Sequence, residues 1–398
     1  MGSTFTFGFG GDDVEDIDSV PDTEHGIPTA KGQGDEENKS GLIFNKAEEL
    51  LLDDMLASLP SQMEFDTQLI RPNDVEPFLI GRRQLTDIRV QLMAEHDMLN
   101  ESEGLLFGLQ KDDIMPAVYE GGFKTWECAM DLAGIVTQGS VKFASPDGED
   151  DINIIELGAG TGVPSLSLFR SFLSQSKSEA TKRRKVRFVL ADYNAAVLKL
   201  ATLPNILLTW FITSRRLREG NPTQADPTVD HLMELDQALL EDFRRDLSDR
   251  GITLSFISGG WSPEFVDLCL GKLQNVSDGA TTGQRPAALE RRTVILASET
   301  IYSPSSLLSF TETLVSLLRR AVSNGAARHE KDKPPVQALI SAKKVYFGVG
   351  GGVSEFLKTL GDVLRGSDEF RALTKSVISD AGVGRIILEV LPKEFVDG

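Results

Sequence analysis

The sequence contains few cysteines and histidines, and this shortage excludes several chemistries. Its 398 residues include only two cysteines and four histidines. Two cysteines cannot supply the framework of a disulfide-stabilised scaffold, and no group of His and Cys residues has the spacing of a metal site. The sequence also lacks a nucleophile elbow and a Walker loop. We therefore interpret Cys128 and Cys269 as reduced, buried thiols and expect no metal.

Basic residues are also scarce relative to acidic ones. The chain has 41 Lys and Arg against 60 Asp and Glu, a formal net charge of −19. Because phosphate binding draws on a basic face, sequence-specific recognition of nucleic acid is disfavoured. The densest apolar run, Ile206 to Ile212, is about half of the roughly 18 residues that span a bilayer, and the first ten residues do not resemble a signal peptide. These shortages predict a soluble, intracellular protein that does not contact a membrane.

The acidic residues that are present gather at the N-terminus. Residues 1–40 hold ten acidic and two basic residues, a formal charge of −8, together with seven glycines and two prolines. Such a segment cannot bury enough apolar surface to offset the entropy lost on ordering. We predict a disordered acidic tail over residues 1–44. Its opening, Met1 to Thr6, fits the pattern for myristoylation of Gly2, which we interpret as a chance match.

Two regions beyond the predicted strands are expected to contain helices, an N-terminal extension that is helical or irregular and an insertion within the main domain. Apolar residues at helical spacing run from Asn45 to Leu59 and from Leu85 to Leu99, in an N-terminal extension over 45–117. A helical insertion is predicted over 204–251, with Gly251 as its left-handed cap. The apolar face of this insertion is expected to comprise Val229, Leu232, Met233, Leu239, Leu240, Phe243 and Leu247.

Residues 118–398 have the pattern of one α/β domain, because apolar runs alternate with amphipathic helical stretches. The turn from Asp380 to Gly384 is too short for a helical crossover, so the two strands that it joins must be antiparallel. We predict a Rossmann-like sheet of seven strands, the last hairpin antiparallel. The predicted strands are Ile152–Leu157, Val186–Ala191, Thr253–Ser258, Thr293–Ser298, Val336–Ala342, Leu373–Ile378 and Arg385–Leu391.

The strongest motif follows the first of these strands. There, Gly158, Gly160 and Gly162 form a G-x-G-x-G turn, and Glu156 precedes the first glycine by two residues. Glycines let the backbone approach a ligand closely, and the following helix offers free N–H donors. A carboxylate at this position can engage the amino group of S-adenosylmethionine, whereas it would repel the pyrophosphate of a dinucleotide. S-adenosylmethionine is therefore the predicted cofactor.

The ends of the next strands meet at the same edge of a doubly wound sheet. Asp192 ends the second strand, where such folds bind a ribose, and Trp261 after the third strand could face an adenine. Glu299 and Tyr302 follow the fourth strand, where a nucleophile would meet the methyl group. Residues 343–352, KKVYFGVGGG, follow the fifth strand and are typical of a loop that closes over a substrate.

Several of these segments resemble a known family, the protein-histidine methyltransferases of the seven-β-strand group. The resemblance covers residues 119–391. Many methyltransferase families share the glycine turn, whereas SETIY and YFGVGGG together are far more specific. The segments that carry the resemblance are YEGGFKTWEC, IELGAGTG, ADYN with the following LPN, ISGGW, SETIY and AKKVYFGVGGG.

This resemblance implies a class I methyltransferase sheet and S-adenosylmethionine-dependent methylation of a histidine in a large-subunit ribosomal protein, in cytoplasm and nucleus. Ribosomal proteins are basic, and an acidic surface can steer such a partner toward itself. A monomer is expected. The cofactor contacts implied by the resemblance are Thr125, Trp126, Glu127, Cys128, Ala129, Gly158, Asp192, Tyr193, Asn194, Gly259, Gly260, Trp261 and Ser298.

The expected chemistry needs little from an acid or base. Imidazole, with a reference pKa of about 6.5, is mostly neutral at pH 7, so the site must fix its tautomer and not deprotonate it. Our hypothesis is that Glu299 or Tyr302 accepts the N–H of the ring, while Tyr346 and Phe347 hold the substrate segment. Two alternatives stay open: a lysine methyltransferase on the same scaffold, since related lysine-directed enzymes carry Asp in place of Glu299, and a non-catalytic binder of ribosomal protein.

Overall fold

The computed structural model describes residues 45–95, 121–138, 151–175, 184–219, 231–271, 291–325, 334–379 and 382–396. The chain divides into two compact units, residues 1–43 and 44–398, and the elements below all belong to the second. The predicted acidic tail, including Gly2, lies outside the described residues.

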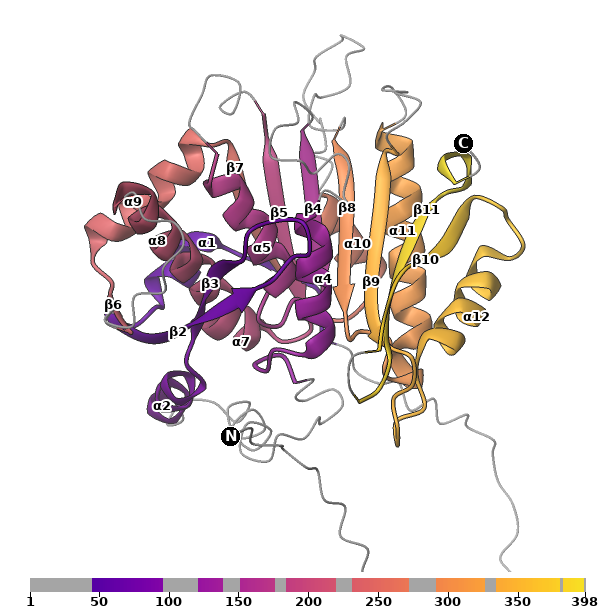
Figure 1. The fold of residues 1–398 in the computed structure, drawn as a ribbon, viewed down its shortest axis with the longest axis horizontal. Coiled ribbons are helices and arrows are strands. Elements are labelled where there is room, and N and C mark those ends of the chain that lie inside the picture. Colours follow the sequence, from indigo (N-terminus) through magenta and orange to yellow (C-terminus); the bar gives the residue numbers. More distant parts are fainter. Residues whose placement is uncertain are drawn as a thin grey trace, which may run out of the picture. The chain divides into compact units, whose positions relative to one another are not determined.

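The central sheet confirms all seven predicted strands and adds one (Figure 1). Its strand order is β1-β7-β5-β4-β8-β9-β11-β10. The five strands from β7 to β9 are parallel. As the short turn predicted, β10 and β11 are antiparallel to each other, and β11 is also antiparallel to β9. The seven predicted strands are observed as β4 (Ile152–Leu157), β5 (Val186–Asp192), β7 (Ile252–Ser258), β8 (Arg292–Ser298), β9 (Val336–Lys343), β10 (Phe370–Ile378) and β11 (Arg385–Pro392).

Helices cover both faces of the sheet, which explains why its strands are apolar at successive positions. In β4, the Ile154 side chain belongs to the hydrophobic core between the sheet and helices α4, α5 and α8. The next side chain, Ile155, belongs to the second hydrophobic core, between the sheet and helices α10, α11 and α12. Glu156 therefore points to the same face as Ile154, toward α5. The bounds of these helices are α4 (Glu127–Thr137), α5 (Val163–Leu173), α8 (Leu203–Glu219), α10 (Pro263–Leu270), α11 (Pro304–Gly325) and α12 (Val353–Leu364).

The N-terminal extension is not purely helical, which corrects the prediction. Its helices are α1 (Leu52–Ala57) and α2 (Leu85–Glu95), but the residues before α1 form strand β1 (Glu48–Leu50), antiparallel to β7. Between the helices lie β2 (Gln62–Ile70) and β3 (Phe78–Arg83). The start of β2 alternates exposed and buried side chains, the signature of a half-buried strand that the helical assignment overlooked.

The insertion likewise contains a strand. Leu232–Glu234 form β6, which pairs with β2 in a second sheet of order β3-β2-β6. The predicted helical face is therefore wrong for Leu232 and Met233, and Val229 lies outside the described residues. The other predicted apolar residues lie on α9 (Gln237–Asp249), and Gly251 has the predicted left-handed φ, 66°.

One helix is longer and more apolar than the sequence suggested. This helix is built from three consecutive segments: α7 (Ala195–Val197), a π-helical turn (Leu198–Thr202) and α8. Pro204 lies just after the π turn, at the start of α8, and does not break the helix. By length and composition, Ala195–Arg215 could cross a membrane. However, 78% of its most apolar window is buried inside the protein. Burial against the sheet explains the apolar composition of this helix.

Candidate active site

The glycine turn after β4 adopts a backbone conformation that favours glycine. Gly158, Gly160 and Gly162 have φ values of 65°, 52° and 75°, in the left-handed region that side chains with a Cβ rarely occupy. A Cβ on Gly158 would also lie 2.8 Å from the Thr300 methyl group. The turn is thus shaped by glycine, and its carbonyl and N–H groups stay accessible to neighbouring side chains.

Three side chains hold this turn in place. The Asp192 carboxylate accepts the Gly160 N–H at 2.9 Å, and the Thr202 hydroxyl donates to the Gly160 carbonyl at 2.7 Å. Asn205 donates to the Thr161 carbonyl at 3.0 Å and accepts the Arg83 N–H of β3 at 2.8 Å. Asn205 belongs to the LPN segment, and its bridging role was missed because sequence spacing does not reveal a contact between β3 and the turn.

Glu156 is a buried acid with one oxygen in use. Its side chain is fully buried, and Oε2 accepts the Ser165 backbone N–H of α5 at 2.9 Å. Oε1 has no hydrogen-bond partner among the described residues. Burial raises the pKa of Glu156 to about 7. A cationic group placed against Oε1 would satisfy this oxygen and favour its ionised form.

Asp192 lies at the end of β5, as predicted, but it is already engaged. Besides Gly160, it accepts the Asn194 backbone N–H at 3.0 Å. Its carboxylate is buried, and burial raises its pKa while these backbone N–H groups oppose the rise. Tyr193 is half-buried beside it, and the Asn194 side-chain Nδ2 is buried without a partner in the described parts of the chain. A ribose hydroxyl would have both an acceptor in Asp192 and a donor in Asn194.

Gly259, Gly260 and Trp261 follow β7 and contact the segment before β1 and helices α10 and α11. A Cβ on Gly259 would lie 2.6 Å from the Lys46 carbonyl oxygen, and Gly260 donates its N–H to the Asn45 carbonyl at 2.9 Å. Trp261 packs edge-on against Phe265 and Phe310, at 5.0 and 5.6 Å between ring centroids. These glycines therefore make room for the segment leading into β1.

The segment before α4 lies beside the glycine turn. The Thr125 hydroxyl is 3.0 Å from the Thr161 hydroxyl, and Trp126 donates its ring N–H to the Gly121 carbonyl at 3.1 Å. Glu127 is exposed, whereas Cys128 and Ala129 are buried at the start of α4. Burial, followed by the charge of Glu299, raises the pKa of the Cys128 thiol. Helix α4, which begins with Glu127 and Cys128, also packs against β8 and β9, whose ends carry the other half of the site.

Glu299 is the centre of that half. It follows Ser298 at the end of β8, and its side chain is 8% exposed. Its Oε2 accepts a hydrogen bond from the Tyr346 hydroxyl at 2.5 Å, whereas Oε1 has no hydrogen-bond partner among the described residues. The Lys343 ammonium lies 3.9 Å from Oε1 and 3.4 Å from Glu127 Oε2.

Tyr302 and Phe347 belong to the segments that follow β8 and β9. Tyr302 is half-buried, and its ring meets the Tyr346 ring edge-on at 6.2 Å. Phe347 is 79% exposed on the loop after β9. Lys343 was not predicted as a site residue, although it begins the KKVYFGVGGG segment; its ammonium lies 5.5 Å from the Trp126 ring centroid. Ser298 is half-buried.

Several buried polar atoms at this edge of the sheet have no hydrogen-bond partner among the described residues. Native proteins pair nearly all such atoms, so a cluster without partners indicates a ligand or water site. Their parent residues come from the ends of β4, β5, β8 and β9, four strands that converge on the crevice. The atoms, unpartnered among the described residues, are Glu156 Oε1, Asn194 Nδ2, Glu299 Oε1, Thr300 Oγ1 and Ser341 Oγ. S-adenosylmethionine, with a cationic end and a ribose, fits the donors and acceptors of Glu156, Asp192 and Asn194.

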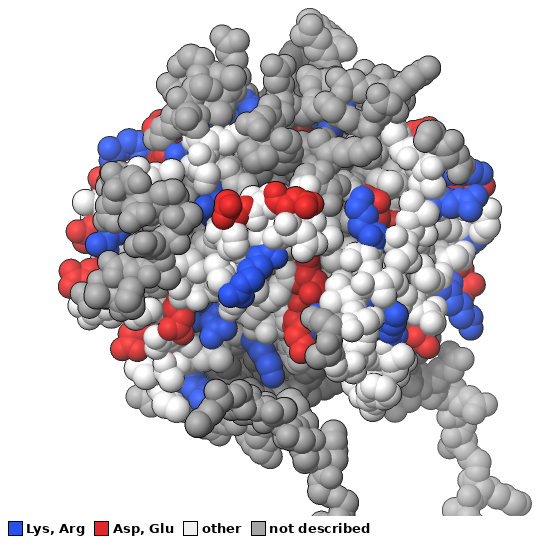
Figure 2. Space-filling model, viewed as in Figure 1, with Lys and Arg blue, Asp and Glu red and all other residues white. Residues whose placement is uncertain are grey.

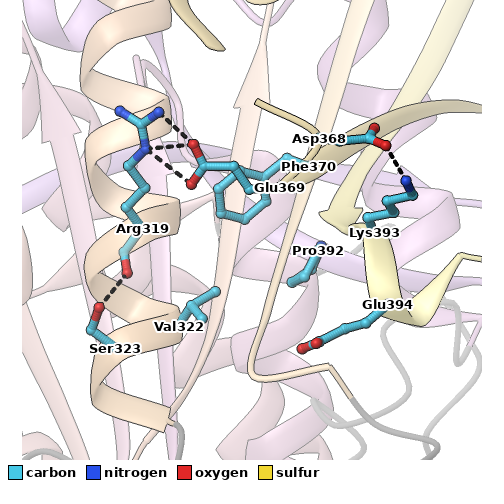
Figure 3. A pocket seen from close by; sticks show the side chains of 9 residues that line it. All are labelled: Arg319, Val322, Ser323, Asp368, Glu369, Phe370, Pro392, Lys393 and Glu394. Carbon is cyan, nitrogen blue, oxygen red and sulfur yellow. Dashed lines mark hydrogen bonds and ion pairs between the residues drawn. The ribbon is translucent and has the colours of Figure 1, made fainter. Parts of the chain in front are cut away.

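A pocket of about 710 Å³ elsewhere in the molecule is a poorer candidate (Figure 3). It lies near the end of α11 and the end of β11, and both basic side chains in its lining are paired with acidic ones. Arg319 contacts Glu369 through Nε at 3.1 Å, and Lys393 contacts Asp368. Within the described residues, no group of His, Cys, Asp and Glu could hold a metal ion.

The visible face of the molecule has no patch of a single charge among the residues that the structure describes. Figure 2 shows basic and acidic side chains interspersed over the described surface around β2, β3 and α4. A protein that reads nucleic acid usually presents a continuous basic face.

Comparisons with known proteins give consistent relatives. The chain is 31% identical to histidine protein methyltransferase 1 of Schizosaccharomyces pombe, over 79% of this chain and 77% of that protein. It is 29% identical to histidine protein methyltransferase 1 of Saccharomyces cerevisiae, over 90% and 91% of the two chains. The homolog in Rattus norvegicus is 28% identical over 94% of this chain and 81% of its own length.

Other comparisons are weaker. No family model matches the chain. Among solved structures, the trans-methyltransferase CalH in complex with SAH is 11% identical, with a TM-score of 0.32, over 77% of this chain and 72% of CalH.

Proposed function

The chain belongs to the histidine protein methyltransferase 1 family and is an S-adenosylmethionine-dependent protein-histidine methyltransferase. From this premise we propose that its substrate is a basic protein of the large ribosomal subunit. The observation that carries the proposed chemistry is the Glu299 carboxylate, buried at the end of β8 with one oxygen held and the other without a partner among the described residues.

The two halves of the site have separate tasks in this mechanism. Glu156, Asp192 and Asn194 would hold S-adenosylmethionine, through one unpartnered oxygen, one carboxylate and one unpartnered amide. When bound, the cofactor supplies an electrophilic methyl group on a sulfonium sulfur. Alignment of the two reactants supplies most of the rate enhancement that such a displacement needs.

Glu299 selects the reactive form of the imidazole. Oε1 accepts the N–H of one ring nitrogen, so the other nitrogen must present its lone pair. As the nitrogen–carbon bond forms, the bond from the methyl carbon to the sulfonium sulfur breaks and its electron pair stays on sulfur, which becomes a neutral thioether. The positive charge passes to the ring, where the carboxylate would stabilise it through a hydrogen bond. The ring N–H proton then passes to Oε1 or to solvent, and the methylated histidine leaves as a neutral side chain. Phe347, exposed beside this centre, offers an apolar contact to the substrate segment.

The charge of the chain supports a basic substrate. Without the −8 of residues 1–40, the remaining 358 residues still carry −11, and a negative field raises the rate of encounter with a positive partner. Because ribosomal proteins pass through both compartments before assembly, we propose that the enzyme acts in cytoplasm and nucleus.

Methylation of ribosomal fractions tests the proposal. The full-length chain is incubated with isotopically labelled S-adenosylmethionine and large subunits or free ribosomal proteins from cells that lack the enzyme. Mass spectrometry then locates the label. Label on one histidine of a large-subunit protein is the expected result. Label on lysine would identify a lysine methyltransferase, and binding of ribosomal protein without incorporation would favour a non-catalytic binder.

A further inference from the structure

The backbone at Glu299 is held in a conformation that is unusual for its residue type. Its φ is 55°, in the left-handed region, where among non-glycine residues the described chain otherwise places only Arg365. The Glu299 N–H donates to the Ser341 carbonyl of β9 at 2.9 Å, which fixes the turn after β8. Such outliers persist where the surrounding structure requires them. Here the turn aims the carboxylate at Tyr346.

The Tyr346 hydroxyl has a defined direction. Its oxygen accepts the Lys343 backbone N–H at 3.2 Å and its proton goes to Glu299 Oε2 at 2.5 Å. Since a carboxylate oxygen accepts hydrogen bonds and has no proton to donate, the hydroxyl acts toward Glu299 as the donor. Burial, and then the charge of Glu299, raises the pKa of Tyr346, so this proton stays on the tyrosine.

The loop that carries Tyr346 is packed tightly against the turn after β8. A Cβ on Gly351 would lie 2.2 Å from the Tyr302 carbonyl oxygen, so only glycine permits this approach. Val349 and Gly350 both donate their N–H groups to the Tyr346 carbonyl at 3.3 Å. Tyr346 therefore sits on a braced loop, with its side chain turned inward, while its neighbour Phe347 is exposed.

Lys343 supplies a reason why Glu299 needs such a partner. Its ammonium lies 3.9 Å from Oε1, close enough to draw the carboxylate into a tighter ion pair if the carboxylate could turn freely. An ion pair of that kind would take up the oxygen that the mechanism needs for the imidazole N–H. A fixed donor on Oε2 opposes this rotation.

We propose that Tyr346 is a positioning residue: by donating to Oε2 it locks the Glu299 carboxylate, so that Oε1 alone faces the N–H of the substrate imidazole. This role rests on the proposed function. It differs from a substrate-holding role, because Tyr346 would act on the rate of methyl transfer through Glu299 and not on substrate affinity.

A double-mutant cycle of Tyr346→Phe and Glu299→Gln tests this role. Tyr346→Phe keeps the ring that packs against Tyr302 and removes only the hydroxyl. We expect kcat to fall about tenfold to a hundredfold, as for a misaligned catalytic group, with KM for the protein substrate and Kd for S-adenosylmethionine within about twofold. In the Glu299→Gln background, Tyr346→Phe should change kcat by less than about twofold, because its target is gone.

Matched measurements separate the possible failures. Val377→Ala, on β10 and 53% exposed, removes an exposed side chain away from the site and should leave kcat and KM within about twofold of the wild type. Equal losses from Tyr346→Phe in both backgrounds, or a raised KM with unchanged kcat, would overturn the positioning role while leaving histidine methylation intact. If the wild-type chain forms no methylhistidine, the proposed function itself is wrong and the positioning role falls with it.

Discussion

Glu156 and Glu299 are buried glutamates at the same edge of one sheet, and each has one oxygen without a partner among the described residues. They differ in what holds the other oxygen. Glu156 accepts a backbone N–H from α5, whereas Glu299 accepts the side-chain hydroxyl of Tyr346 from a loop 47 residues away. The cofactor half of the site is thus built largely on backbone geometry, and the acceptor half on side chains from separate segments.

This difference predicts how each half of the site responds to amino-acid substitutions. Backbone geometry depends on residues that permit it, above all Gly158 and Gly160, so a substitution there should remove binding altogether. The loss of one polar group from a side-chain network leaves one hydrogen bond unmade, which costs about 1–3 kcal/mol, but it leaves the backbone turns in place, so the main loss should be the function of that group. Substitutions in the two halves should therefore separate cofactor binding from turnover.

Gly158→Arg should have the largest effect. The new side chain meets an unfavourable φ of 65° and a Thr300 methyl group 2.8 Å from its Cβ, in the turn where the cofactor is expected. We expect affinity for S-adenosylmethionine, measured by calorimetry, to fall at least about a hundredfold. Gly361→Arg is the control, because Gly361 is exposed on α12 and a Cβ there would have nothing within 4 Å. Retained affinity in Gly158→Arg would contradict a backbone-built cofactor site.

Glu299→Gln should separate the two halves most cleanly. The amide keeps the shape of the side chain but removes the negative charge that stabilises the imidazolium. We expect turnover of the histidine substrate to fall at least about tenfold, with Kd for S-adenosylmethionine unchanged. Turnover within about twofold of wild type, with intact cofactor binding, would show that Glu299 is not the residue that orients the ring.

The pH dependence of cofactor binding should report on Glu156. With a pKa of about 7, this acid ionises in the folded protein between about pH 6 and 8, and its ionised form attracts a cationic ligand. Affinity for S-adenosylmethionine should therefore rise severalfold over this range in calorimetric titrations.

The raised pKa of Glu156 should lower the stability of the unliganded protein as pH rises, although the rise in pH should strengthen cofactor binding. The folded pKa lies above the unfolded value of 4.5, so the folded state binds more protons and the free energy of unfolding should decrease as pH rises from about 4.5 to 7. Glu156→Gln should remove both dependences. A pH-independent affinity in the wild type would place the cofactor's cationic end elsewhere.

The contrast between the backbone-built cofactor half and the side-chain-built acceptor half also explains which features could be predicted from sequence. The strands of the sheet and the glycine turn were predictable, because apolar runs and G-x-G-x-G spacing are local patterns. The pairing of β1 with β7 was not, since three residues with one partly buried side chain carry no periodicity. Nor was the bond from Tyr346 to Glu299, which joins the ends of two neighbouring strands through space. The assigned roles of the site residues stay predictions.

Gly259→Ala should have the smallest effect on cofactor binding. Its effect on stability and on cofactor affinity would show whether Gly259 belongs to the cofactor half of the site or only makes room for the segment before β1. The new Cβ would lie 2.6 Å from the Lys46 carbonyl oxygen and 2.7 Å from the Ala47 Cα, so the segment before β1 must shift. We expect the free energy of unfolding to fall by about 1–3 kcal/mol, while affinity for S-adenosylmethionine changes less than about threefold. Gly361→Ala, on the exposed face of α12, should instead leave stability equal or slightly raised. If Gly259→Ala weakened cofactor binding strongly without lowering stability, Gly259 would belong to the cofactor half, because the added methyl group would then act on the ligand and not on the segment before β1.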